Sequence, residues 1–281
     1  MLLCVRDYGR SWTFHAVYIS FSGYTQRFFA IMDTIQKQRF EHKYVINEEI
    51  ALGIRDFISS YLDMDPYGAT QPNLSYPVHS LYLDSPDLRT YQETVNGDRN
   101  RYKLRIRYYE TADEAPVYFE IKRRVDRIIA KKRAIVHRRA ASDLVRGFIP
   151  SSGDLVYPED GEQMDALLDF SRLVNHLQAR PKVHVSYLRE AWIANGVNKV
   201  RVTMDRNVQS EPQHSISFAH DLRNPHLVFG KKVILELKFT NRFPNWFMDL
   251  VRVFGLRAGP AAKYVDGITN QGEHRFIRNF V

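Results

Sequence analysis

Alternation of polar and apolar residues is the dominant pattern along the chain, and it predicts a fold rich in β-strands. In residues 101–109, RYKLRIRYY, a basic residue stands at every other position, with apolar or aromatic residues between. Successive side chains of a strand point to opposite faces, so this segment predicts a strand with one cationic and one apolar face. The same reasoning predicts strands at residues 39–46, 78–84, 101–110, 117–125, 127–138, 182–193, 199–208 and 231–239.

Helices are predicted between these strands, where apolar residues recur at three- and four-residue spacing. Asn47 is placed to cap the first of them, because its side chain can accept a backbone N–H of the first turn. The predicted helices cover residues 48–61, 85–95, 141–148, 158–178 and 244–255. This order of elements predicts one α+β domain built on an antiparallel sheet or barrel.

The first 31 residues stand apart from this pattern, with neither clean helical nor clean strand periodicity. Met32 opens MDTIQKQRFEHKY, which is typical of a natural start, and charged residues interrupt any signal-peptide pattern before it. Two interpretations stay open. Residues 1–31 are read from a mis-assigned upstream start and are poorly ordered, or they form a terminal element that packs on the domain. In both cases residues 1–37 are an N-terminal extension. We predict a single domain over residues 38–281.

Composition and charge narrow the classes of function. The chain has 281 residues and a formal net charge of +8, which favours an anionic partner such as nucleic acid, nucleotide, polyphosphate or an acidic membrane surface. Its single cysteine, Cys4, excludes an intramolecular disulfide and a cysteine metal site, and favours a reducing, cytoplasmic location. No apolar run reaches about 18 residues, so no membrane segment is predicted.

The charged strand faces carry the chemistry. For any one of these strands, the charged residues are explained by a strand face that is exposed to solvent. In the set, however, Arg and Lys dominate and would repel one another on adjacent strands. Isolated acids also recur among them, at Glu41, Glu120 and Glu236. Arginine and lysine bind phosphate oxygens, and carboxylates bind Mg²⁺ or Mn²⁺, so this mixture favours a phosphate-and-metal site. If the sheet closes, the charged face lines a tunnel and helices cover the apolar outer face.

Eight segments in this order resemble the VTC domain, the catalytic domain of the vacuolar transporter chaperone polyphosphate polymerase and its prokaryotic relatives. That domain belongs to the CYTH-like triphosphate tunnel metalloenzymes. No single motif decides the resemblance, which covers roughly residues 38–268. The segments are RFEHKYVI, SLYLDSPDLRTY, RYKLRIRYY, YFEIKRR, VSYLREAW, VRVTMDRNV, ILELKF and AAKYVDGI.

The resemblance implies an eight-stranded antiparallel β-barrel that forms a basic tunnel, with helices packed on the outside. It implies a phosphotransferase that moves the γ-phosphate of ATP onto a growing polyphosphate chain with Mn²⁺ or Mg²⁺. Carried over by motif, the implied residues are Arg105, Arg107, Lys122, Arg189 and Arg201 for catalysis, Lys43, Lys131, Arg133 and Lys263 for substrate binding, and Glu236 and Glu120 for the metal. Lys132 stays open as an alternative in its strand.

Two departures from the wider superfamily bear on function. The first strand carries one acid before its lysine, EHK, where the superfamily has a paired-acid ExExK, and VTC domains share this reduction. That favours polymerase chemistry over thiamine triphosphatase chemistry. Ala262 replaces a hydroxyl residue, and Pro260 stands where the eukaryotic enzyme has another lysine. This departure weakens the expectation that the protein binds polyphosphate tightly at the exit of the tunnel.

Three other functions stay open. A tunnel triphosphatase would hydrolyse inorganic or nucleoside triphosphate in the same site, and a non-catalytic module would only bind polyphosphate. Nucleic-acid binding is suggested by the basic run 122–139, but the acids between the bases argue against it. The expected partners are therefore ATP and polyphosphate or triphosphate, and any coupling to a membrane would need a partner protein.

Overall fold

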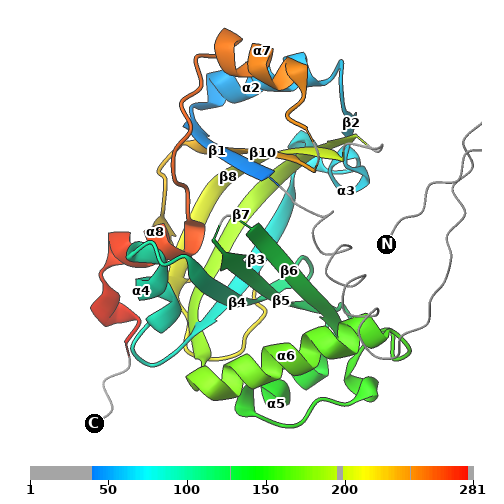
Figure 1. Cartoon of the computed structure of the whole chain (residues 1–281), viewed down its shortest axis with the longest axis vertical. Helices are drawn as coiled ribbons and strands as arrows, with labels where there is room; N and C mark the ends of the chain where they lie inside the picture. The colour runs from blue at the N-terminus through cyan, green and yellow to red at the C-terminus, as the bar shows by residue number, and fades with distance from the viewer. Residues whose placement is uncertain (1–39, 127, 195–198, 241, 278–281) are drawn as a thin grey trace, which may run out of the picture. The chain divides into compact units, whose positions relative to one another are not determined.

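The computed structural model describes residues 40–126, 128–194, 199–240 and 242–277 (Figure 1). The prediction for residues 1–37 lies outside these ranges. The strands are β1 Phe40–Ile46, β2 Asp63–Met64, β3 Tyr76–Asp84, β4 Asn100–Tyr108, β5 Val117–Val125, β6 Ile128–Val136, β7 Arg180–Ala194, β8 Val200–Pro212, β9 His226–Leu227 and β10 Val233–Phe239. The α-helices are α2 Glu48–Ile58, α3 Pro66–Ala69, α4 Arg89–Val95, α5 Ala141–Arg146, α6 Gly161–Leu177, α7 Asn245–Val253 and α8 Lys263–Gln271.

One antiparallel sheet organises the domain. Its strand order is β1-β10-β8-β7-β3-β4-β5-β6, and the short strands β2 and β9 pair with β7 and β8. Each of the eight strands on this path corresponds to a strand predicted from alternation, so the α+β class and the antiparallel sheet are confirmed. Among the described residues, no helix is both long and apolar enough to cross a membrane.

The predicted closure into a barrel is not observed, because no ladder joins β1 to β6 within the described residues. Other segments occupy both edges. The N–H of Gly259 donates to the carbonyl of Lys43 on β1 at 3.0 Å, and the N–H of Val156 donates to the carbonyl of Ile135 on β6 at 3.0 Å. Strands β1 and β6 therefore each form backbone hydrogen bonds with another segment and not with each other. The sheet curls without closing into a barrel.

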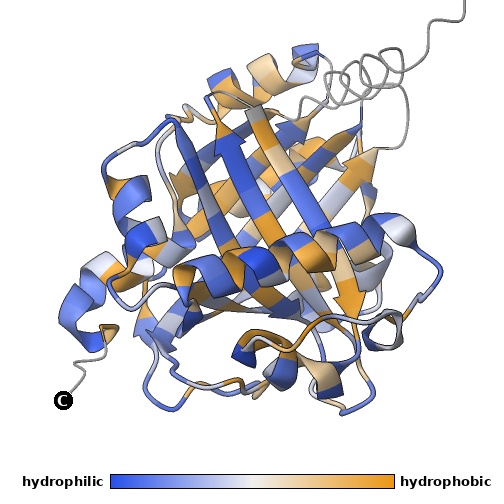
Figure 2. Ribbon diagram, turned by 60° about the horizontal axis from the view of Figure 1, so that its bottom comes forward, coloured by the Kyte–Doolittle hydropathy of each residue, from blue (hydrophilic) through white to orange (hydrophobic). Residues whose placement is uncertain are grey.

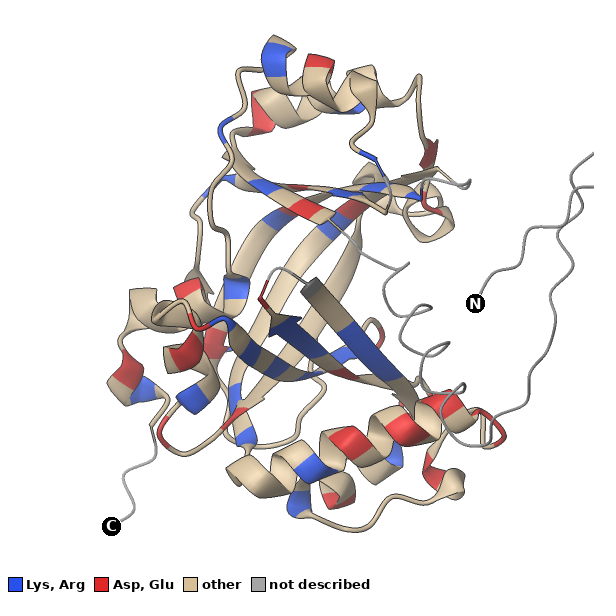
Figure 3. Ribbon diagram, in the orientation of Figure 1, with Lys and Arg blue, Asp and Glu red and all other residues tan. Residues whose placement is uncertain are grey.

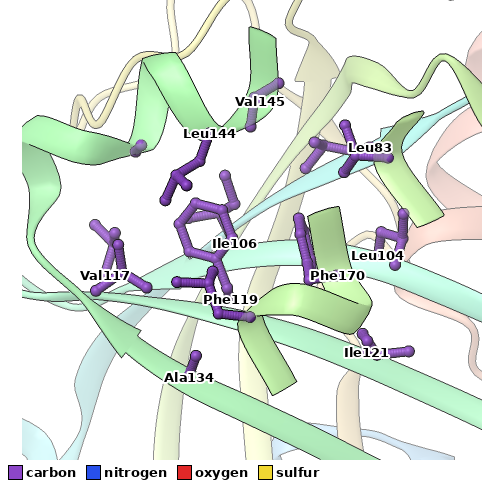
Figure 4. Close-up of a cluster of buried hydrophobic side chains, with 14 of the residues drawn as sticks. Leu83, Leu104, Ile106, Val117, Phe119, Ile121, Ala134, Leu144, Val145 and Phe170 are labelled. Atoms are coloured by element: carbon purple, nitrogen blue, oxygen red, sulfur yellow. The ribbon is translucent and has the colours of Figure 1, made fainter. Parts of the chain in front are cut away.

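The apolar outer face of the sheet is covered by helices, as the alternation predicts. Helices α2 and α7 pack over β1, β10 and β8, where Ile54, Leu237 and Phe247 belong to one buried cluster. Helices α5 and α6 pack over β4, β5 and β6, where the rings of Phe119 and Phe170 lie 4.8 Å apart, edge to face (Figure 4). Figure 2 shows the alternating hydropathy along these strands.

Helix α8 is an exception, because it packs on the opposite, inner face of the sheet. Tyr264 stacks on Tyr82 of β3 with ring centroids 4.7 Å apart, and its hydroxyl donates to Asp84 at 2.5 Å. Gly267 allows the close approach to β8, because a Cβ at this position would lie 2.8 Å from Oγ of Ser210. Helix α8 therefore fills part of the concave side that the strands form.

Two buried histidines on the outer face have no carboxylate partner among the residues that the structure describes. Nδ1 of His79 lies 3.1 Å from Nε2 of His184, which also lies 3.1 Å from the hydroxyl of Tyr108. Burial, followed by the nearby His184, lowers the pKa of His79 to about 3. Burial, followed by the nearby His220, lowers the pKa of His184 to about 4. Both imidazoles are therefore neutral in the folded protein at mildly acidic pH.

We predict that this pair makes the fold sensitive to acid. The unfolded chain binds protons near pH 6.5 and the folded chain does not, so stability falls as pH drops from 6.5 toward 4. The two histidines together should lower the free energy of unfolding by roughly 2 kcal/mol between pH 6 and pH 5. Denaturant unfolding at both pH values measures this change. In His79→Leu about half of it should disappear, and an unchanged slope would contradict the assignment.

Candidate active site

The charged sides of the strands meet on the inner face of the sheet, the side that carries Lys43, Arg105, Glu120, Arg189 and Glu236 (Figure 3). Curling brings the two ends of the sheet together there. Lys122 on β5 reaches Glu41 on β1 at 3.4 Å, although these strands are far apart in the strand order. An ion pair between side chains thus spans the gap that backbone hydrogen bonds leave open.

The first of two carboxylate centres on this face is Glu236 on β10. Its oxygens lie 3.2 Å from Lys263 and 3.4 Å from Lys43, and they also accept from Lys238. Arg189 lies 3.7 Å away. Burial opposes ionisation of this carboxyl, but the surrounding cations, Lys238 first, outweigh it and hold its pKa well below the usual range. Glu236 is therefore a buried anion enclosed by cations.

Asp205 on β8 extends this centre. Arg189 binds it through two N–H groups at 2.7 Å each, the bidentate geometry that fixes a guanidinium most firmly. Nζ of Lys263 lies 2.7 Å from the same carboxylate. Because Lys263 is the first residue of α8, the helix packed on the inner face delivers a cation between Asp205 and Glu236.

The second centre is Glu120 on β5. It forms ion pairs at 2.6 Å with each of Arg105, Lys131 and Arg133, from β4 and β6. Burial raises the pKa of this carboxyl, but Arg105 and Arg107 together with the other cations hold it well below its usual range. One carboxylate facing three cations leaves a net positive charge, which a bound anion would offset.

Arg107 lies between the two centres. It is 6% exposed, and it lies 3.5 Å from Oγ of Ser80 and 3.3 Å from the hydroxyl of Tyr187. In the part of the chain that the structure describes, it forms no ion pair with a carboxylate. The ring of Tyr187 lies 5.1 Å from the guanidinium of Arg189 and 5.0 Å from Nζ of Lys263. Tyr187 thus contacts Arg107 and two cations of the first centre.

Ten of the eleven residues predicted from the family resemblance lie in or between these two centres. Arg201 is placed differently: it binds Asp65, in the segment before α3, at 2.7 Å and lies 3.3 Å from the hydroxyl of Tyr76. On β6, Lys131 contacts Glu120, whereas Lys132 reaches Asp169 of α6 on the outer face. Face parity therefore separates these two neighbouring lysines.

The structure adds four inner-face residues that sequence reasoning did not select. Lys238 is a direct partner of Glu236, Asp205 is a direct partner of Arg189, and Tyr187 links Arg107 to the first centre. Lys103 on β4 lies with its Nζ 5.6 Å from the ring centroid of Tyr264. The signal for Lys238, Asp205 and Lys103 was their strand parity. They stand within ILELKF, VRVTMDRNV and RYKLRIRYY, but the resemblance assigned no role to them.

Glu236 and Glu41 are the described carboxylates that could serve a divalent metal together. No group of three acidic, histidine or cysteine side chains within the described residues is arranged to hold a metal alone. Mg²⁺-type sites commonly use one or two carboxylates together with phosphate oxygens. Lys43 lies 3.2 Å from Glu41 and 3.4 Å from Glu236, so these two carboxylates already share one cation. The cations around Glu120 contact no second carboxylate of the described chain. Glu120 is therefore less suited than Glu236 to bind a metal.

The family model of the VTC domain matches residues 38–270. The chain belongs to the VTC domain family. Its inner face and its family together indicate an enzyme that acts on triphosphate substrates, and the family implies a divalent metal. No protein in a comparison with curated sequences matches this VTC domain.

Solved structures give more distant likenesses. A candidate adenylate cyclase from Bacillus halodurans is 16% identical with a TM-score of 0.45, covering 80% of this chain and 94% of its own. A Pyrococcus horikoshii protein is 13% identical with a TM-score of 0.41, covering 83% and 99%. A candidate adenylyl cyclase from Hippeastrum with a dominant triphosphatase activity is 12% identical with a TM-score of 0.45, covering 83% and 96%.

We predict that Glu120→Gln destabilises the protein, because it leaves three cations without their carboxylate. Removing one partner of a buried ion pair typically costs about 3–5 kcal/mol, and the partial exposure of Lys131 and Arg133 favours the lower end. Inorganic triphosphate should restore part of the loss. Chemical unfolding with and without triphosphate measures both effects.

Asp169→Asn is the matched control, because it removes a partly exposed carboxylate from the exposed Lys132. An exposed pair contributes about 1 kcal/mol or less, so this variant should remain close to the unmodified protein. Equal destabilisation of the two variants would contradict the electrostatic interpretation of Glu120.

Proposed function

We propose that this VTC domain is a metal-dependent polyphosphate polymerase, which transfers the γ-phosphate of ATP to the end of a polyphosphate chain. The observation that carries the proposal is the excess of fixed cations on the inner face. Three cations surround Glu120, and Lys43, Lys238, Lys263 and Arg189 surround Glu236. A bound polyphosphate would offset this charge.

Arginines and lysines have different roles in this proposal. Arg105 and Arg107 stand on one strand, two residues apart, and their planar guanidinium groups would each bind two phosphate oxygens. Arg189, held by Asp205, would present its remaining N–H to a phosphate in a fixed orientation. The lysines, as compact point charges, would neutralise phosphate oxygens without demanding one geometry.

Glu236, with Glu41 beside it, would hold Mn²⁺ or Mg²⁺ on this face. When bound, the metal neutralises charge on the phosphate oxygens. Glu120 has a different role in the proposal: it keeps Arg105 and Arg133 in place against their mutual repulsion. This assignment follows from the separate surroundings of the two carboxylates, one beside a second carboxylate and the other among cations alone.

The transfer needs no nucleophile from the protein. A terminal phosphate oxygen of the acceptor chain attacks the γ-phosphorus of ATP in line, a new P–O–P bond forms, and the bond to ADP breaks. The protein's contribution is to align donor and acceptor and to place positive charge where the transferred oxygens carry negative charge. If water takes the place of the acceptor, the same face hydrolyses triphosphate.

The direct test is incubation of the pure protein with ATP and Mn²⁺, followed by ³¹P NMR of the products. Internal phosphate signals that grow together with ADP would establish the polymerase. Release of orthophosphate alone would make the protein a triphosphatase. Tight binding of triphosphate without turnover would leave a binding module. Chelation of the metal should abolish turnover in the first two cases.

Glu236→Gln and Arg107→Ala should each lower the turnover number by about 10²–10³-fold, the usual cost of removing one charged group from a site of electrostatic catalysis. Steady-state assays of ADP formation measure the loss, and thermal unfolding checks that each variant is folded. Arg172→Gln, an exposed residue of α6 on the outer face, is the control and should keep full activity. A folded Glu236→Gln protein with normal turnover would refute the site.

A further inference from the structure

Four tyrosines form a chain of ring contacts at one end of the inner face. The ring centroids of Tyr67 and Tyr76 lie 6.1 Å apart, and those of Tyr76 and Tyr109 lie 6.2 Å apart. Tyr109 in turn lies 5.5 Å from Tyr118, edge to face. These residues, here called the tyrosine cluster, come from α3, β3, the segment after β4, and β5. None of them has a role in the phosphate transfer proposed above.

The tyrosine cluster adjoins the arginines that the proposed reaction uses. Tyr118 on β5 stands directly opposite Arg107 on β4, and Tyr76 on β3 stands directly opposite Arg189 on β7. Directly opposite residues of an antiparallel pair share one face of the sheet, so both tyrosines lie on the inner face. Tyr109 stands two residues past Arg107 and contacts both rings. A phosphate bound by these arginines therefore has aromatic rings beside it.

Asp65 fixes the position of the outermost ring, that of Tyr67. Its backbone N–H donates to the carbonyl of Ala191 on β7 at 2.9 Å, and its carboxylate accepts the N–H of Tyr67 at 3.1 Å. The same carboxylate forms the 2.7 Å ion pair with Arg201, whose guanidinium also lies 3.3 Å from the hydroxyl of Tyr76. Helix α3 is thereby held at one end of the sheet, beside β2 (Figure 1). Arg201, which the resemblance implied for catalysis, thus contacts the tyrosine cluster.

This end of the inner face is open to solvent. Tyr67 is 74% exposed, and the side chain of Arg201 is 40% exposed. Arg133, which lies 5.0 Å from a ring of the cluster, has a side chain that is 38% exposed. Tyr82 and Tyr264, further along the inner face, stack on each other and are buried. A ligand can therefore reach aromatic rings at the tyrosine cluster but not at α8.

We infer that the tyrosine cluster binds the nucleoside of the ATP donor, with the adenine base against its rings. The inference rests on the proposed function of the inner face, and it adds recognition of the part of ATP that does not react. Bases stack on aromatic side chains because every base has a π-face. The charged groups of Asp65 and Arg201, beside the rings, offer hydrogen-bond partners to the ribose or to the edge of the base.

This placement gives the donor one orientation on the sheet. Tyr109 stands four residues along the chain from Arg105, about 13 Å in an extended strand. The ribose and the first phosphates of ATP would occupy this span, so the γ-phosphate would point from the cluster toward Glu120. At the other end of β4, Lys103 lies 5.6 Å from the ring centroid of Tyr264, which is buried. The described residues therefore favour one direction for ATP.

The test compares two ligands that share a triphosphate and differ in the nucleoside. They are the β,γ-imido analogue of ATP and inorganic triphosphate, titrated calorimetrically without added metal so that no turnover intervenes. Loss of a stacking ring typically weakens binding of a base about 5- to 100-fold, so Tyr67→Ala should lower the affinity for the ATP analogue about fivefold or more. Tyr109→Leu, at the centre of the cluster, should act in the same direction. The affinity for inorganic triphosphate, which has no base, should stay unchanged.

Tyr61→Ala is the matched control. Tyr61 is also exposed and also stacks on a ring, that of Trp246 at 4.8 Å, but it lies on the outer face after α2. Its loss should leave both affinities unchanged. Equal losses for the ATP analogue and for inorganic triphosphate in Tyr67→Ala and Tyr109→Leu would place the two tyrosines in the phosphate site and overturn the inference. An unchanged affinity for the ATP analogue in both variants would also overturn it.

Steady-state kinetics separates this inference from the proposed reaction. The base lies away from the reacting phosphorus, so Tyr67→Ala should raise KM for ATP more than it lowers the turnover number. A protein that loses affinity for the ATP analogue in this variant, yet makes no polyphosphate, keeps the nucleoside site and loses the proposed polymerase. A polymerase whose affinity for the analogue responds to neither substitution keeps its function and loses the nucleoside site. Thermal unfolding checks that each variant is folded.

Discussion

Compensation of buried positive charge is the constraint on which the rest of this structure depends. A few carboxylates, Glu120, Asp205 and Glu236 among them, must hold a larger number of arginines and lysines on one face of a curled sheet. Each of these anions contacts cations from at least two elements, so the network ties strands together across their register. The same network leaves positive charge in excess, which favours the binding of anions to the inner face.

The sheet and α8 together determine which parts of that face a ligand can reach. Both edges of the sheet are paired with other segments, so it curls without a continuous ladder, and the Lys122–Glu41 ion pair spans the opening. Helix α8 occupies the side of β7 and β8. The face is more exposed at Lys122 and Lys131, on β5 and β6, and enclosed at the Glu236 centre, where four cations converge.

Much of this could be predicted from local pattern. Strict alternation in RYKLRIRYY and YFEIKRR fixes which side chains share a face, because the period of a strand is two, and that places Arg105 and Glu120 together. The local pattern could not predict contacts between residues that are far apart in the sequence. The pairing of the edge of β1 with Gly259 depends on a contact between residues far apart in sequence. For the same reason Lys238 and Asp205 were not selected, because their roles depend on their ion pairs with Glu236 and Arg189.

The local sequence gave a wrong start for helix α4 and no prediction of helix α8. Ser85 and Pro86 predicted a helix start, but the carboxylate of Asp84 accepts the N–H groups of Ser85, Thr90 and Tyr91, so the chain turns first and α4 begins at Arg89. Helix α8 was not predicted at all. Its sequence, KYVDGITNQ, has a glycine in the middle, and that glycine serves the approach to Ser210.

The place of α8 on the inner face has a consequence for biosynthesis. A chain is made from its N-terminus, so every strand of the sheet exists before Lys263 does. Until then, Asp205 and Glu236 lack one of their closest cations, and the apolar side chains beneath α8, Val185 among them, have no cover. The nascent sheet thus carries an unfinished site and an exposed apolar surface at once. One late helix completes both, so we expect the inner face to reach its final charge balance only after Lys263 has been made.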